Sequence, residues 1–232
     1  QIPILTKDEI RENFSSFIAS KSKYLKRITT GGSTGMPLTV CHDKRFPIEI
    51  IGWDLLESWG INLASNKAYI NRIVRTSRLS NILNFLMWYP TKRIFLDAKN
   101  LTNETMQVFT TELFKLKPKV LQGYAGGLLE YAKYSEERKI SFDFLQVVWS
   151  TSAPLSDSNR KYIENIFNSR VYDQYGCCEI FWLAAECKFQ KGLHVHDAFR
   201  LIEVVDENGN LKKDGEYGDI IVTDLFNFAF PL

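Results

Sequence analysis

The sequence predicts an α/β fold: a mainly parallel sheet with flanking helices, followed by a C-terminal layer rich in β-strands. Two observations support this. From about residue 102 onward, short apolar strands alternate with amphipathic helices, which is the pattern of a parallel sheet. Near Phe181 the rhythm changes to strands and tight turns, including a hairpin turn over 206–209. We therefore expect an α/β subdomain over residues 1–180 and a β-rich subdomain over 181–232.

The first part of the chain is expected to begin with a helix. The hydroxyl of Thr6 and the carboxylate of Glu9 have the spacing of a capping box, so an amphipathic helix should run from there to about Ile18. Apolar residues at helical spacing over 43–61 predict a second, longer helix. The remaining elements expected here are strands over 38–41, 68–74 and 93–96 and a helix over 82–87.

The second part supplies the alternating pattern. The expected helices cover 104–115, 126–138 and 157–167, and the expected strands cover 119–122, 145–149, 170–173 and 201–205. In open α/β sheets, ligands bind outside the carboxyl ends of the strands. Ser152 and Gln174 each follow one of two neighbouring strands, so the sequence predicts a ligand site at this edge.

Composition excludes several classes of protein. The net charge is only +2 and basic residues are interspersed with acidic ones, which argues against a nucleic-acid partner. The four cysteines include an adjacent pair and do not suggest a disulfide framework, and no secretory signal opens the chain. The longest apolar stretches, such as 82–89, are too short to cross a bilayer. We expect no membrane partner and a cytoplasmic location.

The segment from Thr29 to Pro37 concentrates glycines and hydroxyls in one loop. Glycines let the backbone approach a ligand closely, and a concave nest of N–H groups suits phosphate oxygens. The Gly-Lys-Ser/Thr ending of a P-loop is absent. Taken alone, such a loop is equally compatible with a plain turn or linker.

This loop resembles the phosphate-binding signature of adenylate-forming (ANL) enzymes. Tyr175 to Glu179 is similar to that superfamily's Tyr-Gly-x-Thr-Glu motif, and Gly215 to Leu232 is similar to a later segment in the right order. The closest similarity is to the phenylacetate–coenzyme A ligase and CapK-like (capsular polysaccharide) branch, over nearly the whole chain. The stretches that carry it are 2–7, 117–125, 153–157, 170–176 and 184–187, with His194 close behind.

The resemblance implies ATP-dependent activation of a carboxylic acid, in which the acid is joined to the α-phosphorus of ATP with Mg²⁺ present and an acyl-adenylate forms. Thioester formation with coenzyme A would follow. One alternative is an adenylating acyltransferase that hands the acyl group to an amine, a sugar or a protein. Another is a non-catalytic nucleotide-binding partner in polysaccharide biosynthesis. The resemblance also implies a large N-terminal portion without the C-terminal lid domain, poorly active alone, and it allows a homodimer.

The resemblance also assigns roles to residues. Glu179 and Thr30 are the expected catalytic residues, with Glu179 as the Mg²⁺ ligand, and Tyr124, Gly126 and Gly127 are expected to form the substrate pocket. The expected nucleotide-binding residues are Thr29, Gly31, Gly32, Ser33, Thr34, Gly35, Ser152, Ala153, Pro154, Asp173, Gln174, Tyr175, Gly176 and Cys178.

Two positions depart from the family pattern, and one metal site is only half specified. Cys178 stands where the family usually has Thr or Ser, and Ala153 stands where the CapK-like pattern often has Glu. A thiol is a weaker hydrogen-bond donor than a hydroxyl, so the Cys178 contact to phosphate is expected to be weak. Cys187 and His194 are expected to supply two ligands of a structural Zn²⁺, the alternative being a buried cysteine beside surface histidines.

Overall fold

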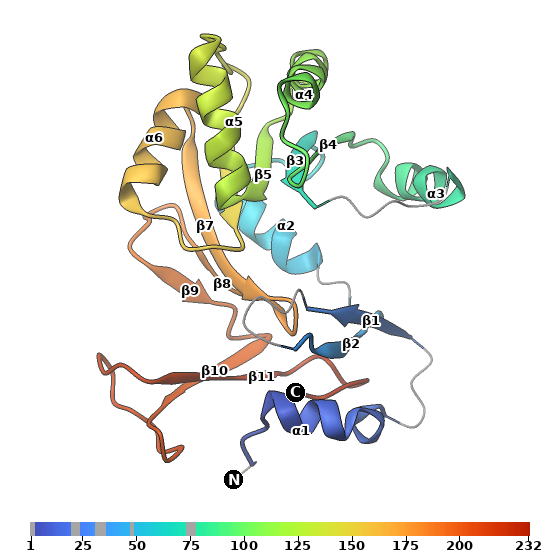
Figure 1. Ribbon diagram of the computed structural model, residues 1–232, viewed down its shortest axis with the longest axis vertical. Coiled ribbons are helices and arrows are strands. Elements are labelled where there is room, and N and C mark those ends of the chain that lie inside the picture. The colour runs from blue at the N-terminus through green and yellow to red at the C-terminus, as the bar shows by residue number, and fades with distance from the viewer. Residues whose placement is uncertain (1–2, 20–23, 31–35, 47–48, 73–77) are drawn as a thin grey trace. The chain divides into compact units, whose positions relative to one another are not determined.

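The computed structural model describes residues 3–19, 24–30, 36–46, 49–72 and 78–232 (Figure 1). The chain divides into two compact units. Unit 1 comprises residues 1–51, 176–184 and 195–232, and unit 2 comprises residues 52–175 and 185–194. Both units are discontinuous, which differs from the two contiguous segments expected from the sequence. The N-terminal residues group with the C-terminal ones because strands and core side chains from the two ends pack together.

Unit 2 is built on parallel strands. The seven-stranded sheet has the order β4-β3-β5-β6-β7-β8-β9, and the neighbours from β4 to β7 run parallel. The strands are β3 (Lys67–Asn71), β4 (Arg93–Asp97), β5 (Val120–Tyr124), β6 (Val147–Thr151), β7 (Arg170–Cys177), β8 (Phe181–Glu186) and β9 (Leu193–Val195). This confirms the predicted mainly parallel sheet.

Three helices cover one face of these strands: α4 (Asn103–Leu116), α5 (Ala125–Glu137) and α6 (Asp157–Phe167). The fully buried ring of Tyr131 packs against Phe109, Phe142 and Phe167 in this layer. Because side chains alternate across a strand, Val148 points into this core while its neighbour Trp149 does not. Burial on both faces explains why these strands read as continuous apolar runs.

The opposite face of the strands is covered by aromatic residues. Trp59 lies just after α2 (Glu49–Ser58), stacks on Tyr172 at 4.6 Å between ring centroids, and meets Trp149 edge-on. Its indole N–H donates to the carbonyl of Glu186, so the polar end of the buried ring is satisfied. The remaining helix of unit 2, α3, spans Arg78–Trp88.

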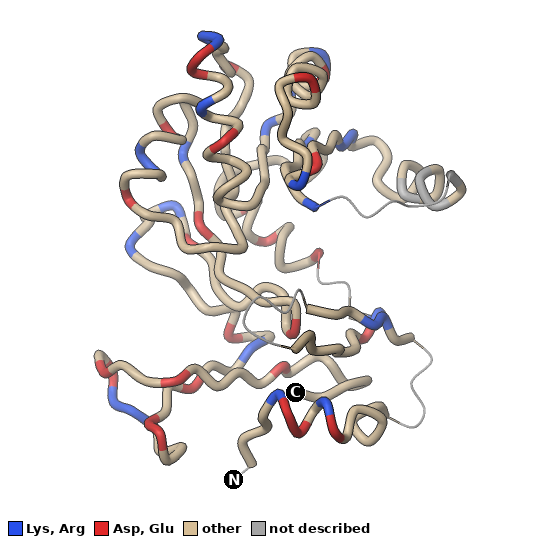
Figure 2. The backbone as a smooth tube through the Cα atoms, viewed as in Figure 1, with Lys and Arg blue, Asp and Glu red and all other residues tan. Residues whose placement is uncertain are grey.

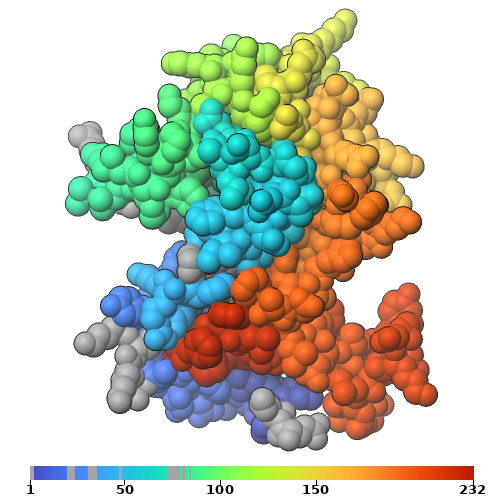
Figure 3. All heavy atoms as spheres, turned by 180° about the vertical axis from the view of Figure 1, so that it is seen from behind, coloured from blue at the N-terminus to red at the C-terminus, as the bar shows by residue number. Residues whose placement is uncertain are grey.

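Unit 1 contains two antiparallel strand pairs. One joins β1 (Leu25–Thr29) to β2 (Thr39–Asp43), and the other joins β10 (Arg200–Val205) to β11 (Asp219–Asp224). Phe230 packs with Ile10, Leu38 and Val40 in a small core, and Figure 3 shows the last residues of the chain lying against the first ones. The antiparallel pair near the C-terminus confirms the predicted β-rich layer.

Three elements differ from the sequence-based expectation. Helix α1 spans only Lys7–Glu12 and is followed by a 3₁₀ helix, Phe14–Phe17, because Asn13 caps the end of α1 with its side-chain and backbone N–H groups. The helix expected over 43–61 is α2, which starts at Glu49; Asp43 belongs to β2 and binds Arg45 instead. The turn over 206–209 forms, and Val205 bridges to Leu211 just after it, but the strand that pairs with β10 along its whole length is β11.

The charged residues are distributed in the structure as the composition predicted. Figure 2 shows acidic and basic residues interspersed along the backbone, and α1 itself carries both signs. Among the residues that the structure describes, no helix combines the length and the apolar character needed to span a bilayer.

Candidate functional site

The carboxyl ends of β5, β6 and β7 meet at one edge of the parallel sheet. The pairing places Tyr124 opposite Thr151, and Thr151 opposite Gln174. The hydroxyl of Thr151 donates to the side-chain oxygen of Gln174 at 2.8 Å, which fixes the buried Gln174 at this edge. The next residue, Ser152, adopts a left-handed conformation at φ 79°, so the chain turns sharply before Ala153 and Pro154. The structure thus brings two of the predicted nucleotide-binding segments together.

Asp173 is the most unusual group at this edge. Its backbone N–H donates to Glu186, and its own Oδ1 is buried without a well-formed hydrogen bond among the described residues. Burial raises the pKa of Asp173, and the nearby charge of Glu186 adds to this. A ligand hydroxyl or amino group would supply the missing donor. Next to it the ring of Tyr175 is 46% exposed, which leaves its face accessible.

The two glycines of the predicted substrate pocket have different surroundings. A Cβ atom at Gly126 would meet nothing within 4 Å, so this position faces open space. A Cβ atom at Gly127 would lie 2.9 Å from the side chain of Ile70 in β3. Gly127 is therefore explained by close packing of α5 on the sheet, whereas Gly126 fits the predicted pocket beside the exposed Tyr124.

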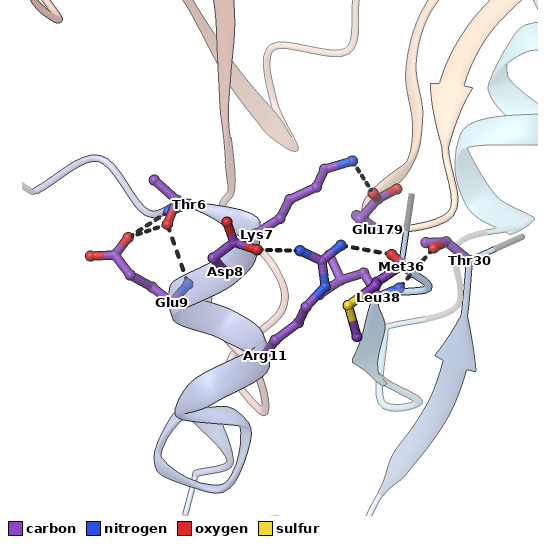
Figure 4. A network of polar contacts seen from close by, with 9 residues as sticks. All are labelled: Thr6, Lys7, Asp8, Glu9, Arg11, Thr30, Met36, Leu38 and Glu179. Atoms are coloured by element: carbon purple, nitrogen blue, oxygen red, sulfur yellow. Dashed lines mark hydrogen bonds and ion pairs between the residues drawn. The ribbon is translucent and has the colours of Figure 1, made fainter. Parts of the chain in front are cut away.

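In unit 1, the acidic residue of the Tyr-Gly-x-x-Glu segment lies in the turn between β7 and β8. Glu179 accepts an ion pair from the ammonium of Lys7, with 2.9 Å between Nζ and Oε1 (Figure 4). The Glu179 side chain is 15% exposed and the Lys7 side chain 64%. Partial burial favours the protonated acid, but the hydrogen bond and charge of Lys7, together with hydrogen bonds from a backbone N–H and from Cys177, outweigh it, so the pKa of Glu179 lies below its ordinary value.

The hydroxyl-rich loop is described only at its two ends. Gly31, Gly32, Ser33, Thr34 and Gly35 lie outside the described residues. The backbone N–H of Thr30 donates to the carbonyl of Leu38, and the N–H of Leu38 donates to the hydroxyl oxygen of Thr30, both at 2.9 Å. Thr29 contacts Thr39 through their hydroxyls. Thr30 therefore closes the base of the loop, a structural role beside the catalytic one predicted for it.

One face of α1 holds both Glu179 and the exit of this loop. Lys7 contacts Glu179, and Arg11, one helical turn later, donates to the carbonyl of Met36 at 2.7 Å (Figure 4). Residues four apart in a helix lie on the same side. Thr6 and Glu9 form the predicted capping box, which fixes where the helix starts. The start of the helix in turn sets the direction in which Lys7 and Arg11 point. The sequence analysis did not single out Lys7 or Arg11 as site residues, although their spacing was a usable signal.

A pocket of about 220 Å³ in unit 1 is lined by residues that include His42, Phe181 and Arg200. The Nε2 atom of His42 lies 3.0 Å from the carbonyl oxygen of Cys178, and the His42 ring packs on Phe181 at 4.2 Å. Burial lowers the pKa of His42 and raises the pKa of the Cys177 thiol to about 11. The Cys178 residue itself is exposed and unbridged. The contact of Cys178 with phosphate stays a prediction.

The sequence predicted two metal sites, one for Zn²⁺ and one for Mg²⁺. Among the described residues, no three His, Cys, Asp or Glu side chains come together as metal ligands. Cys187 is half-buried and His194 is exposed on β9, and their role as two of the ligands of a zinc site stays a prediction. Mg²⁺ fits Glu179 better, because this ion keeps most of its water and phosphate ligands and needs few carboxylates. The Glu179 carboxylate already binds a cation, the ammonium of Lys7.

Comparison with known proteins supports the predicted resemblance. No family model matches the chain. Protein CapK of Staphylococcus aureus is 25% identical over 241 residues, covering 100% of this chain and 51% of its own length. The chain therefore spans about half of the curated relative that it matches.

Solved structures show the same fold. A 2-hydroxyisobutyryl-CoA ligase in complex with 2-HIB-AMP and CoA has a TM-score of 0.80 at 15% identity, covering 100% of this chain and 56% of that one. The anthranilate CoA ligase AuaEII in complex with anthranoyl-AMP has a TM-score of 0.67 at 15% identity, covering 89% and 39%. The chain thus has the fold of a large portion of adenylate-forming ligases, as the sequence predicted.

Proposed function

We propose that the protein activates a carboxylic acid with ATP, forming an acyl-adenylate and releasing pyrophosphate. The observation that carries this proposal is the arrangement on α1: Lys7 holds Glu179 while Arg11 holds the exit of the hydroxyl-rich loop at Met36. A carboxylate and a phosphate-binding loop on one side of a helix suit a metal-bound triphosphate. The fold shared with enzymes whose structures contain acyl-AMP supports the same reaction class.

The reaction joins an oxygen of the acid to the α-phosphorus of ATP and breaks the bond from that phosphorus to the pyrophosphate oxygen. Such transfers depend mainly on positioning and electrostatics. Residues 29–35 would hold the β- and γ-phosphates, and a Mg²⁺ ion at Glu179 would neutralise their charge. Within unit 2, the roles that the resemblance implies stay predictions: Asp173 and Tyr175 are expected to contact a nucleoside, and Gly126 and Tyr124 are expected to border the acid.

The acceptor of the acyl group is part of the proposal. Coenzyme A is favoured because the 2-hydroxyisobutyryl-CoA ligase structure holds both an acyl-AMP and CoA. The alternative acceptors are an amine, a sugar or a protein, and the similarity to CapK keeps a role in polysaccharide biosynthesis among the predictions. A cytoplasmic location, a homodimer and low activity without a lid domain also stay predictions.

Two measurements test the proposal. Calorimetric titration of ATP into the protein should give saturable binding that tightens with Mg²⁺, and Glu179→Gln should remove most of the Mg²⁺ effect. In the full-length protein, labelled pyrophosphate should exchange into ATP only when a suitable carboxylic acid is added. ATP binding without exchange for any acid would favour the non-catalytic alternative, and the absence of ATP binding would refute the proposal.

A further inference from the structure

Lys7 makes the one ion pair that the described residues provide for Glu179. The two side chains are unequally buried, since Glu179 is 15% exposed and Lys7 is 64% exposed. A lysine ammonium is a compact charge on a flexible stem, and it binds without the fixed two-point geometry of arginine. The carboxylate therefore stays in place while the cation beside it is free to exchange.

Arg11 has the opposite character on the same face of α1. Its guanidinium bonds both the carboxylate of Asp8 and the carbonyl of Met36, and its side chain is 28% exposed. The contact with Met36 ties α1 to the loop exit whether or not Lys7 keeps its partner, and the pair with Asp8, within α1 itself, orients the guanidinium. The helix therefore has one fixed anchor at Arg11 and one exchangeable contact at Lys7.

We propose that Lys7 is the counter-cation of Glu179 until a metal ion replaces it, and that α1 is in this way a working part of the nucleotide site. The inference rests on the proposed function, because it assumes that a triphosphate binds beside Glu179. Lys7 is a positioning residue here: it acts through Glu179 and takes no part in the transfer itself.

The physical reason lies in the charges. Metal-free ATP is a polyanion, and an unpaired carboxylate near its phosphates would repel it. The Lys7 ammonium cancels that repulsion before the metal arrives. Glu179 would hold Mg²⁺ in the metal-bound state, and its charge would then be neutralised without the Lys7 ammonium, which would be free to move away because the lysine side chain is exposed. Lys7 should therefore matter most for ATP binding without metal, and only while Glu179 carries its charge.

The test is a double-mutant cycle read by calorimetric ATP binding in EDTA and in excess Mg²⁺. We expect Lys7→Met to weaken metal-free binding by about tenfold, equivalent to about 1.4 kcal/mol. In excess Mg²⁺ the loss should fall to about twofold or less. Glu179→Gln should bind metal-free ATP at least as well as the wild type, and adding Lys7→Met to it should change nothing further. Lys7→Arg should restore most of the metal-free affinity.

A matched control is available on α5. Lys133 pairs with Glu130 at 2.7 Å, and both side chains are about half exposed, so Lys133→Met removes an ordinary surface ion pair. It should leave ATP binding unchanged in both conditions. Thermal unfolding of each variant checks folding, and Lys7→Gln repeats the test with a polar side chain if Lys7→Met does not fold.

The outcomes separate the inference from the proposed function. An equal loss with and without Mg²⁺ would show that Lys7 only braces the structure, and a loss that persists beside Glu179→Gln would show a direct contact with phosphate. Either result overturns the inference while leaving the proposed function intact. If the wild-type protein binds no ATP even in Mg²⁺, the proposed function fails and the inference fails with it.

Discussion

Two glutamates close together in the sequence have opposite surroundings. Glu186, in β8, accepts hydrogen bonds from both terminal nitrogens of Arg160, at 2.9 and 2.8 Å, and a third from the backbone N–H of Asp173. Its side chain is 8% exposed and that of Arg160 is 18% exposed. Glu179 has the single, largely exposed ammonium of Lys7. Both are acidic residues beside a strand end, yet only one of them is fully enclosed.

The difference teaches which carboxylate is structural and which is available for a ligand. A bidentate arginine pair reinforced by a backbone donor leaves Glu186 no free position and no reason to exchange its partner. Among the described residues, Glu179 has one ion-pair partner, Lys7, so a competing cation would need to displace one ammonium rather than a bidentate guanidinium. Burial alone does not separate the two residues, because both side chains are less than one-fifth exposed.

The largest expected effect on stability comes from removing the carboxylate of Glu186, which binds Arg160 and the backbone N–H of Asp173. Glu186→Ala should lower the free energy of unfolding by about 3 kcal/mol, because it leaves the Arg160 charge and the Asp173 N–H without their partner. The matched substitution Glu179→Ala should cost less than about 1 kcal/mol, since its lysine is exposed. Urea denaturation of both variants measures the two values. Similar losses at the two positions would break the comparison.

A second test compares two neighbouring glycines of α5, Gly127, which packs closely on the sheet, and Gly126, which does not. Gly127→Ala should destabilise the protein by about 1–3 kcal/mol, because the new methyl group would overlap Ile70. Gly126→Ala should be neutral or stabilising by up to about 1 kcal/mol, because alanine favours the helix and meets nothing there. Thermal unfolding of the pair reports the difference. A stable Gly127→Ala variant would show that α5 has room to shift from the sheet.

The smallest expected effect concerns pH near the Glu179 turn. Burial, the largest influence, lowers the folded-state pKa of His42 below the ordinary value of 6.5, while the contact with the Cys178 carbonyl and the charge of Asp224 act against it. Because the unfolded chain then takes up a proton first, stability should fall as pH drops from about 6.5 toward the folded-state pKa.

His42→Gln should remove that part of the pH dependence. The test is to measure denaturation midpoints between pH 5 and pH 8, in steps of about one pH unit around the ordinary histidine pKa. The variant should show a flatter profile than the wild type over the acidic half of the range. An unchanged slope would assign the pH dependence to other groups, such as the carboxylates in unit 1.

Much of the fold could be predicted from local patterns. The helix over 157–167 has the predicted bounds, and the strands of the parallel sheet lie within a few residues of their predicted positions. Alternation of apolar runs with amphipathic helices is a short-range signal that any window of the chain displays. The predicted start of α2 was wrong because residue 43 belongs to β2: Asp43 ends that strand and binds Arg45, and the helix begins only at Glu49.

The single residues of the candidate site could be predicted from the sequence, but their contacts with one another could not. The motif reading identified Glu179, the hydroxyl-rich loop and the strand ends at Ser152 and Asp173. It gave no partner for Glu179 and no distinction between Gly126 and Gly127. Each of these depends on segments that are distant in the chain.

The sequence by itself determined the α/β class and the order of the helices and parallel strands over 103–173, because periodicity and capping act over a few neighbouring residues. Only the tertiary structure decided that Lys7 pairs with Glu179, that Arg160 encloses Glu186, and that the two ends of the chain share a core. Charge pairing and burial depend on distances through space. Those distances exist only once the strands have paired.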